Sequence, residues 1–308
     1  MASEVTGVAT LVEYRLDLMG KFDLERLIRE TPLPCIITCR SQAHGGRFQD
    51  SADAQLRILR EAYERGAPYV DVEWEQLHRF PRGDGPGKII GSFHDFRSIG
   101  WDWLTLAEHI HMLGADIVKL VGTASSPEDV LTPLAWLHHW PQPAIGIAMG
   151  EHGVASRLLA PRFPRAFLSF AAAEQGTAPG QIAAHDMVSR YAYHRLASAE
   201  RVLVLLTPFP VPWSLVDTYR DKLAQDSDQA ETLLLPLPVS SLGPRLWRAL
   251  HLARVEAIVA LPGVRKQPEL AHCGVDARAS AWNLRRGTSL HSDTSRVDPR
   301  LLTNLLHS

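Results

Sequence analysis

The chain has 308 residues, a length that predicts two domains. Hydrophobic residues make up 45% and charged residues 21%, which is typical of a globular protein. Its 32 basic and 34 acidic residues leave a net charge of -2, which gives no electrostatic argument for binding nucleic acid or an anionic membrane. No apolar run approaches the roughly 18 residues of a membrane span, and no basic segment precedes an apolar stretch at the start, so we expect neither a membrane anchor nor a signal peptide.

Short apolar segments alternate with longer amphipathic ones over residues 1–198. We predict strands at Thr10–Asp17, Pro34–Arg40, Tyr69–Trp74, Lys88–Phe93, Asp116–Val121, Ala144–Met149 and Ala166–Ala171. Helices are predicted between them, at Ala52–Arg65, Trp103–Leu113 and Pro127–His138. Strands that alternate with helices form a parallel sheet. So many units in one domain favour a (β/α)8 barrel of the TIM type over an open sheet.

The rhythm changes after residue 198, so residues 199–308 are predicted to form a second, smaller α/β domain. This part contains the proline-rich segment Thr207–Trp213 and two strand-like segments, Thr232–Leu237 and Ala257–Leu261. Its last forty residues are polar and rich in turn-forming residues.

Lys119 is a lone cation in the apolar segment Gly114–Gly122. The segment is short, bounded by glycine and rich in Val and Ile, which predicts a buried strand of a parallel sheet. Burial disfavours the charged form of an amine, and a free amine can attack a ketone to form an imine. The alternative is that Lys119 lies at the strand end and extends its amine into water.

Charged and reactive residues recur at the carboxyl ends of the predicted strands, where parallel barrels build their active sites. These residues are Glu13, Arg15, Arg40, His94, Asp95, Lys119, Arg157 and Gln181. Because the arginine fork can bind both oxygens of a carboxylate, the set indicates a small polyhydroxylated carboxylate as ligand. The alternative is an ordinary barrel rim of solvated charges.

The chain has three cysteines, Cys35, Cys39 and Cys273. Cys35 and Cys39 are four residues apart on one predicted strand, so they cannot easily bridge each other. An odd count without CxxC spacing argues against a disulfide framework and against a zinc site, and we expect no metal. A reducing compartment fits best, so we expect a cytoplasmic protein.

Six segments resemble, in order, the motifs of type I 3-dehydroquinate dehydratase, the Schiff-base-forming barrel enzyme of the shikimate pathway. They are Glu13–Asp17, Thr38–Ser41 with Gly45-Gly46, Ser92–Phe96, Gly114–Lys119, Gly153–Leu158 and Ala178–Ile182. The resemblance covers roughly Leu11 to Met187. It implies conversion of 3-dehydroquinate to 3-dehydroshikimate plus water, in aromatic amino acid and chorismate biosynthesis, without a metal or organic cofactor.

The resemblance also implies a role for each matching residue. Lys119 would form the imine with the substrate ketone, and His94 would remove the adjacent proton and later protonate the departing hydroxyl. Histidine suits both steps because its pKa lies near working pH. The substrate-binding residues would be Glu13, Arg15 and Arg40 at the ring hydroxyls, Arg157 at the carboxylate, and Thr177 and Gln181 in the pocket lining.

Two departures from the family pattern stand out. The family has a glutamate that contacts the catalytic histidine just before the Gly-Gly pair, and here that position is His44. We therefore include His44 in the catalytic set and expect turnover to be reduced but not abolished, with His44→Glu raising it. The family also has one more strand before the Glu-x-Arg strand, so the predicted barrel lacks its first strand. Either the start is misplaced, or the second domain or a partner covers the gap, or the barrel is damaged.

Residues 199–308 resemble, more faintly, the substrate-binding domain of shikimate dehydrogenase. The matching segments are Val259–Pro262, Ala281–Asn283 and His291–Asp293. Val264 occupies the place of the catalytic lysine in that family, and no GxGxxG motif follows a strand. We therefore predict a degenerate, truncated domain without dehydrogenase activity.

A second hypothesis is a catalytically impaired relative that binds a shikimate-pathway metabolite as a regulator or scaffold. Histidine in place of the family's glutamate at position 44 and the degenerate second domain favour this hypothesis. The presence of both Lys119 and His94 favours the enzyme. An aldolase-like barrel using the same lysine fits the flanking motifs less well. We expect the small molecule 3-dehydroquinate as partner, with no nucleic acid and no membrane, and the sequence leaves a homodimer open.

Overall fold

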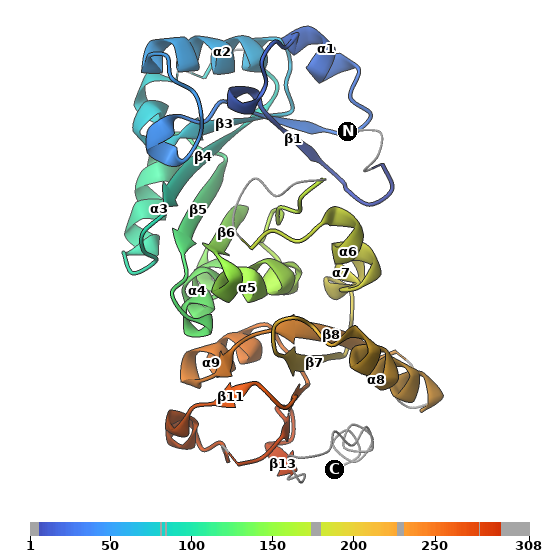
Figure 1. Ribbon diagram of the computed structural model, residues 1–308. Coiled ribbons are helices and arrows are strands. Elements are labelled where there is room, and N and C mark those ends of the chain that lie inside the picture. The colour runs from blue at the N-terminus through green and yellow to red at the C-terminus, as the bar shows by residue number, and fades with distance from the viewer. Residues whose placement is uncertain are drawn as a thin grey trace.

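The computed structural model describes residues 6–80, 82–83, 85–173, 180–226, 231–276 and 278–290. Its first part is a six-stranded parallel sheet whose strands follow chain order. The strands are β1 (Val12–Arg15), β2 (Cys35–Thr38), β3 (Tyr69–Glu73), β4 (Lys88–Asp95), β5 (Ile117–Thr123) and β6 (Ala144–Met149). Figure 1 shows this sheet curling like part of a barrel wall.

The helices that follow the strands of the curled sheet cover its convex side (Figure 1). They are α1 (Leu24–Arg29), α2 (Ala52–Glu64), α3 (Trp103–Met112), α4 (Leu131–His139) and α5 (Val154–Leu159), and α6 (Ala184–Ser189) and α7 (Tyr193–Leu196) lead on to the second sheet. Short 3-10 turns occupy η1 (Leu16–Leu18), η2 (Gln42–His44), η3 (Trp74–Arg79), η4 (Pro127–Val130), η5 (Glu151–Gly153) and η6 (Ala160–Arg162). The side chains of Ser51 and Asp102 cap α2 and α3 at the predicted starts.

The apolar residues of the strands divide between the two faces of the curled sheet. On β5, Ile117 and Val121 join a cluster on the concave side, while Val118 and Leu120 pack into the larger core that includes the helices. This follows from the two-residue period of a strand, because successive side chains point to opposite faces. Lys119 therefore shares the inner face with Ile117 and Val121.

The prediction of a seventh strand at Ala166–Ala171 is wrong. The segment runs beside β6 but makes one isolated parallel bridge, Ala144 to Ala166. Beyond it, Phe167 and Phe170 turn onto the concave apolar cluster instead of continuing the ladder. Of the described residues, β1 and β6 form the two ends of the six-stranded sheet. The architecture is thus an incomplete (β/α) barrel, as the fold prediction anticipated.

The second part is a five-stranded mixed sheet of order β13-β12-β10-β7-β8. Its core strands β7 (Val202–Thr207), β8 (Leu233–Pro238) and β10 (Ala257–Ala260) are parallel, and β12 (Ala281–Asn283) and β13 (Thr288–Leu290) are antiparallel. The remaining elements are α8 (Trp213–Gln225), β9 (Ser241–Leu242), α9 (Pro244–Leu252), β11 (Arg265–Lys266) and η8 (Pro268–Cys273). The predicted strands at 232–237 and 257–261 are confirmed to within one residue at each end.

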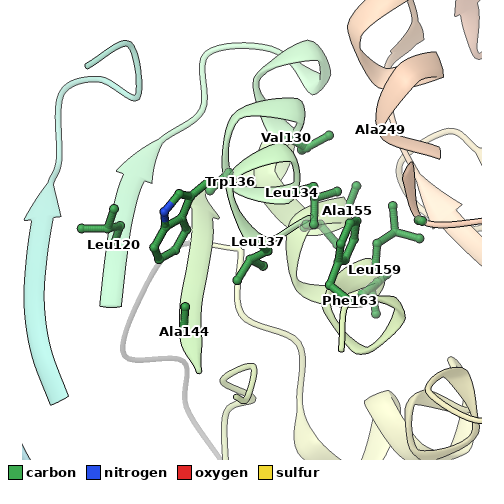
Figure 2. Packing of buried hydrophobic residues seen from close by; sticks show 14 of the residues in the cluster. Leu120, Val130, Leu134, Trp136, Leu137, Ala144, Ala155, Leu159, Phe163 and Ala249 are labelled. Carbon is green, nitrogen blue, oxygen red and sulfur yellow. The ribbon is translucent and has the colours of Figure 1, made fainter. Parts of the chain in front are cut away.

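Apolar packing joins the two sheets. One buried cluster includes Leu134 of α4, Leu159 of α5 and Ala249 of α9, which Figure 2 shows at close range. Helices of the barrel wall therefore form the surface on which the second sheet rests. None of the described helices is long and apolar enough to cross a bilayer.

A single carboxylate adds polar contacts to this junction. Glu128 of η4 accepts hydrogen bonds from the backbone N–H groups of Gly243 at 3.0 Å and Arg245 at 2.8 Å, at the start of α9. The Arg245 guanidinium also donates hydrogen bonds to the Glu128 carbonyl oxygen and to the Thr132 hydroxyl. Because a helix N-terminus favours a negative charge, Glu128 caps α9 from another part of the chain.

We predict that Glu128→Gln destabilises the protein, because the amide carries no charge and has only one acceptor oxygen for the backbone N–H groups of Gly243, Arg245 and Leu246. The free energy of unfolding should fall by about 1–3 kcal/mol, measured by urea denaturation. The matched control is Glu108→Gln, since Glu108 is exposed on α3. Equal stability of the two variants would contradict the capping role of Glu128.

Candidate active site

The predicted site residues Glu13 and Lys119 converge with three residues that were not predicted, because all five share one face of successive strands. The two-residue period places Glu13, Thr38, Asp71, Ser92 and Lys119 on the concave face, from β1, β2, β3, β4 and β5 in turn. Hydrogen bonds and ion pairs join them side by side: Thr38 to Glu13, Asp71 to Ser92, and Lys119 to both acids. The sheet therefore gathers charges from five strands into one polar layer.

Lys119 is buried as predicted, with 5% of its surface exposed. Its Nζ lies 2.9 Å from Asp71 Oδ2 and 3.7 Å from Glu13 Oε1. The ring of Phe170 covers it, with 4.4 Å from Nζ to the ring centroid. The amine is therefore held between two carboxylates and an aromatic face. These ion pairs were not predicted from the sequence, where the expected change in the amine rested on desolvation alone.

Asp71 is a site residue that the sequence analysis did not identify. It is 1% exposed, and its carboxylate binds Lys119 on one oxygen and Arg40 on the other, at 2.8 Å from the guanidinium. Although burial opposes it, Arg40 and Lys119 hold the pKa of Asp71 well below its usual range. The signal was present in the sequence, since Asp71 interrupts an apolar strand just as Lys119 does.

Arg40 is buried at the end of β2 with 3% exposure. Besides Asp71, it contacts Ser92 Oγ at 2.8 Å and lies 3.8 Å from Glu73. These contacts fix the guanidinium beside the Lys119 amine. The proposed contact of Arg40 with a ring hydroxyl stays a prediction.

Arg15 lies on the same strand as Glu13, as predicted, but its guanidinium pairs with Asp17 through two hydrogen bonds of 2.8 Å. Asp17 in turn accepts from the backbone N–H groups of Arg40 and Arg47. The Arg15–Asp17 pair therefore holds both ends of the loop that carries His44.

His94 follows on β4, and its pKa is held well below 6.5, first by burial of the ring and then by the cations Arg40 and Lys119, which outweigh Asp71. The imidazole is therefore neutral near neutral pH and can act as a base. Phe96 stacks on it at 6.3 Å between ring centroids. The next residue, Asp95, accepts hydrogen bonds from Arg97 and Ser98 and so closes the turn after β4.

His44 lies at the end of η2 with 8% exposure. Its ring centroid is 6.3 Å from that of His94, with the rings nearly perpendicular. Gly45 follows in the left-handed region with a φ of 75°, and a Cβ there would lie 2.2 Å from the Phe96 ring. Only glycine meets both constraints, so Gly45 allows His44 to lie close to the His94 ring.

Arg157 is buried on α5 with 2% exposure, and burial lowers its pKa to about 10. One guanidinium nitrogen is 3.4 Å from the Phe170 carbonyl oxygen, and Nε has no partner among the described residues. No carboxylate of the described residues is within ion-pair distance of Arg157. A buried cation without an anion fits the predicted contact with a substrate carboxylate.

Gln181 lies in the described segment after residue 180, where Gly180 approaches the Gly150 backbone so closely that a Cβ would lie 2.3 Å from its carbonyl oxygen. Thr177 lies outside the described residues. The three cysteines are free, with Cys35 and Cys39 buried. Within the described residues, no group of three or more His, Cys, Asp or Glu side chains could hold a metal ion.

The model of the type I 3-dehydroquinase family matches residues 1–197. The chain belongs to this family. The bifunctional 3-dehydroquinate dehydratase/shikimate dehydrogenase of Arabidopsis thaliana is 34% identical over 63% of this chain, which spans 34% of that relative's length. The 3-dehydroquinate dehydratase of Methanocaldococcus jannaschii is 33% identical over 59% of this chain and 86% of its own length.

Solved structures agree with this family assignment. The 3-dehydroquinate dehydratase of Geobacillus kaustophilus has a TM-score of 0.56 and 29% identity, over 65% of this chain and 86% of that one. Dehydroquinate dehydratase and shikimate dehydrogenase from S. pombe AroM has a TM-score of 0.51 and 19% identity, over 84% of this chain and 54% of that one. At this identity the likeness concerns the fold alone. Because it covers 84% of this chain, the fold likeness reaches beyond residue 197 into the second sheet.

We predict that Asp71→Asn strongly destabilises the protein at neutral pH, because it leaves Arg40 and Lys119 as neighbouring buried cations. Removing one partner of a buried ion pair costs about 3–5 kcal/mol, measured here by urea denaturation. The control Asp53→Asn breaks the exposed ion pair with Arg79 and should change stability little. A loss for Asp71→Asn no larger than for Asp53→Asn would contradict the role given to this carboxylate.

Proposed function

We propose that this protein converts 3-dehydroquinate to 3-dehydroshikimate plus water through a Schiff base on Lys119. The observation that carries the proposal is a buried amine on the concave face of the sheet, in the same group of charges as a neutral imidazole. Membership of the type I 3-dehydroquinase family supports it. The reaction is a carbon–oxygen lyase step and needs no metal or organic cofactor.

In the first step, the Lys119 ammonium gives up a proton and the free amine attacks the ketone carbon. The C–O π bond breaks, and the oxygen takes up that proton and one from the nitrogen and leaves as water, so that a C=N bond replaces the C=O bond in a protonated imine. Asp71 and Glu13 lie beside the nitrogen before and after this step. Their negative charges therefore stabilise the positively charged imine that replaces the ammonium.

In the second step, His94 removes the proton on the carbon next to the imine. The electron pair of the broken C–H bond moves toward the imine nitrogen, which forms an enamine. The enamine then returns the electron pair, the C–O bond to the adjacent hydroxyl breaks, and protonated His94 supplies the proton that makes it water. Hydrolysis of the imine releases the product and restores the amine.

Binding is assigned to the residues around this pair. Arg157 meets the substrate carboxylate, because it is a buried cation without a carboxylate partner in the described protein. Glu13, Arg15 and Arg40 bind ring hydroxyls, and Gln181 and Thr177 line the pocket. We assign no dehydrogenase activity to the second domain, residues 199–308, where buried Val264 stands in place of the expected lysine.

We predict that borohydride reduction in the presence of 3-dehydroquinate traps a covalent adduct on Lys119, detected by intact mass and peptide mapping. Lys119→Arg should abolish both the adduct and turnover, because a guanidinium does not form the imine. The matched control Lys88→Arg changes an exposed lysine at the opposite end of β4 and should keep both.

The same experiment tests the competing function. Tight binding of 3-dehydroquinate without adduct or product would overturn the proposed dehydratase function and support the alternative, a metabolite-binding regulator. An adduct on a different lysine would overturn the assignment of Lys119.

We further propose that turnover is lower than in relatives that have glutamate at the position of His44. A carboxylate at position 44 should raise kcat by roughly fivefold, well below the 10²–10⁴-fold of complete acid–base catalysis. The variant combines His44→Glu with Glu75→Gln, because His44 Nε2 lies 3.1 Å from Glu75 and two carboxylates there would repel. A folded double variant that forms the adduct with unchanged or lower kcat would contradict the proposal.

A further inference from the structure

A second carboxylate reaches the His94 side of the site through His44. Glu75 lies on η3, directly after β3, and its Oε2 is 3.1 Å from His44 Nε2. The side chain of His44 is 9% exposed, whereas that of Glu75 is 46% exposed. Although partial burial opposes it, His44 lowers the pKa of the Glu75 carboxyl, so Glu75 is ionised at neutral pH.

The contact with Glu75 determines what His44 offers on its other side. A carboxylate accepts hydrogen bonds, so Nε2 of His44 carries a hydrogen toward Glu75. In the neutral ring Nδ1 is then a free acceptor. This Nδ1 is buried and has no hydrogen-bond partner among the described residues.

His94 presents a matching group. Its Nδ1 is also buried and without a partner in the described protein, and its ring meets that of His44 edge to face, at 6.3 Å and 85°. Buried polar nitrogens are normally satisfied. Since neither nitrogen has a partner, the two rings are not hydrogen-bonded directly, but one bound water between them would satisfy both nitrogens if one carries a hydrogen and the other does not.

We propose that Glu75 is a positioning residue that acts on His94 through His44. The proposal rests on the assignment of His94 as the catalytic base. Glu75 fixes the tautomer of His44, whose Nδ1 then accepts a hydrogen bond from a water that in turn accepts the hydrogen of His94 Nδ1. The lone pair on Nε2 of His94 is then free to take the proton from the substrate.

The charges around His94 explain why a link from Glu75 through His44 would help catalysis. Burial, Arg40 at the end of β2, Lys119 on β5 and His44 in η2 all disfavour a positive charge on His94, and only Asp71 on β3 among the groups that act on it favours one. The proton-transfer step nevertheless makes His94 an imidazolium. A carboxylate at the far side of His44 stabilises that charge through the intervening ring.

Glu75→Gln tests the proposal in the full-length protein. It should lower kcat about tenfold and leave KM within about twofold, because the substrate does not touch Glu75. The base is active when neutral, and losing the carboxylate lowers its pKa, so the acid limb of the kcat–pH profile should move to lower pH. In a His44→Gln background Glu75→Gln should have no further effect, because the intermediary is gone.

Glu108→Gln is the matched control, and it should change neither kcat nor the pH profile. A Glu75→Gln variant with the wild-type pH profile would overturn the proposal, and so would an equal loss in the wild-type and His44→Gln backgrounds. Either result would reduce Glu75 to a structural contact of η2.

A second measurement does not depend on turnover. The pKa of His94, followed by NMR in histidine-labelled protein and assigned with His94→Gln, should be lower in Glu75→Gln than in wild type and unchanged in Glu108→Gln. An unchanged pKa in Glu75→Gln overturns the inference even in an inactive protein. Wild-type protein that gives neither adduct nor product, yet shows this shift, would instead overturn the proposed dehydratase activity alone.

Discussion

The carboxylate of Asp71 is the contact on which the rest of the site depends. It binds Arg40 on one oxygen and Lys119 on the other, and all three side chains are buried. Without it, the two cations, one after β2 and one on β5, would face each other in a space with little water. Burial of the His94 ring, and then the same two cations, keep that ring unprotonated. One negative charge therefore allows the buried amine and the neutral imidazole to which we assign catalysis to coexist.

The second part of the protein contacts the turn that follows the strand of Lys119. Glu128, which caps α9, lies in the turn that follows β5, the strand of Lys119. The turn also hydrogen-bonds to the end of β6, where Ala124 N–H donates to the Met149 carbonyl oxygen. The second sheet thus braces the loop at the carboxyl end of the barrel strands. Such a structural contribution does not require dehydrogenase chemistry in residues 199–308.

Sequence patterns could predict the parts of the fold that depend on local order. The six strands and the position of Lys119 follow from apolar runs and their two-residue period. The seventh strand failed because an apolar run shows only that a segment is buried. Phe167 and Phe170 are partly buried against the concave cluster without pairing. Asp71 and Glu75 were missed because their roles come from partners far away along the chain, Lys119 and His44.

The proposed mechanism requires that Lys119, His94 and Arg157 act on one substrate molecule. A crystal structure of the borohydride-reduced complex with 3-dehydroquinate would show whether they do. We expect continuous density from Lys119 Nζ to the ring carbon, the ligand carboxylate on Arg157, and an imidazole nitrogen of His94 within hydrogen-bond reach of the adjacent carbon's proton. A ligand bound away from Lys119, or one whose carboxylate does not meet Arg157, would contradict it.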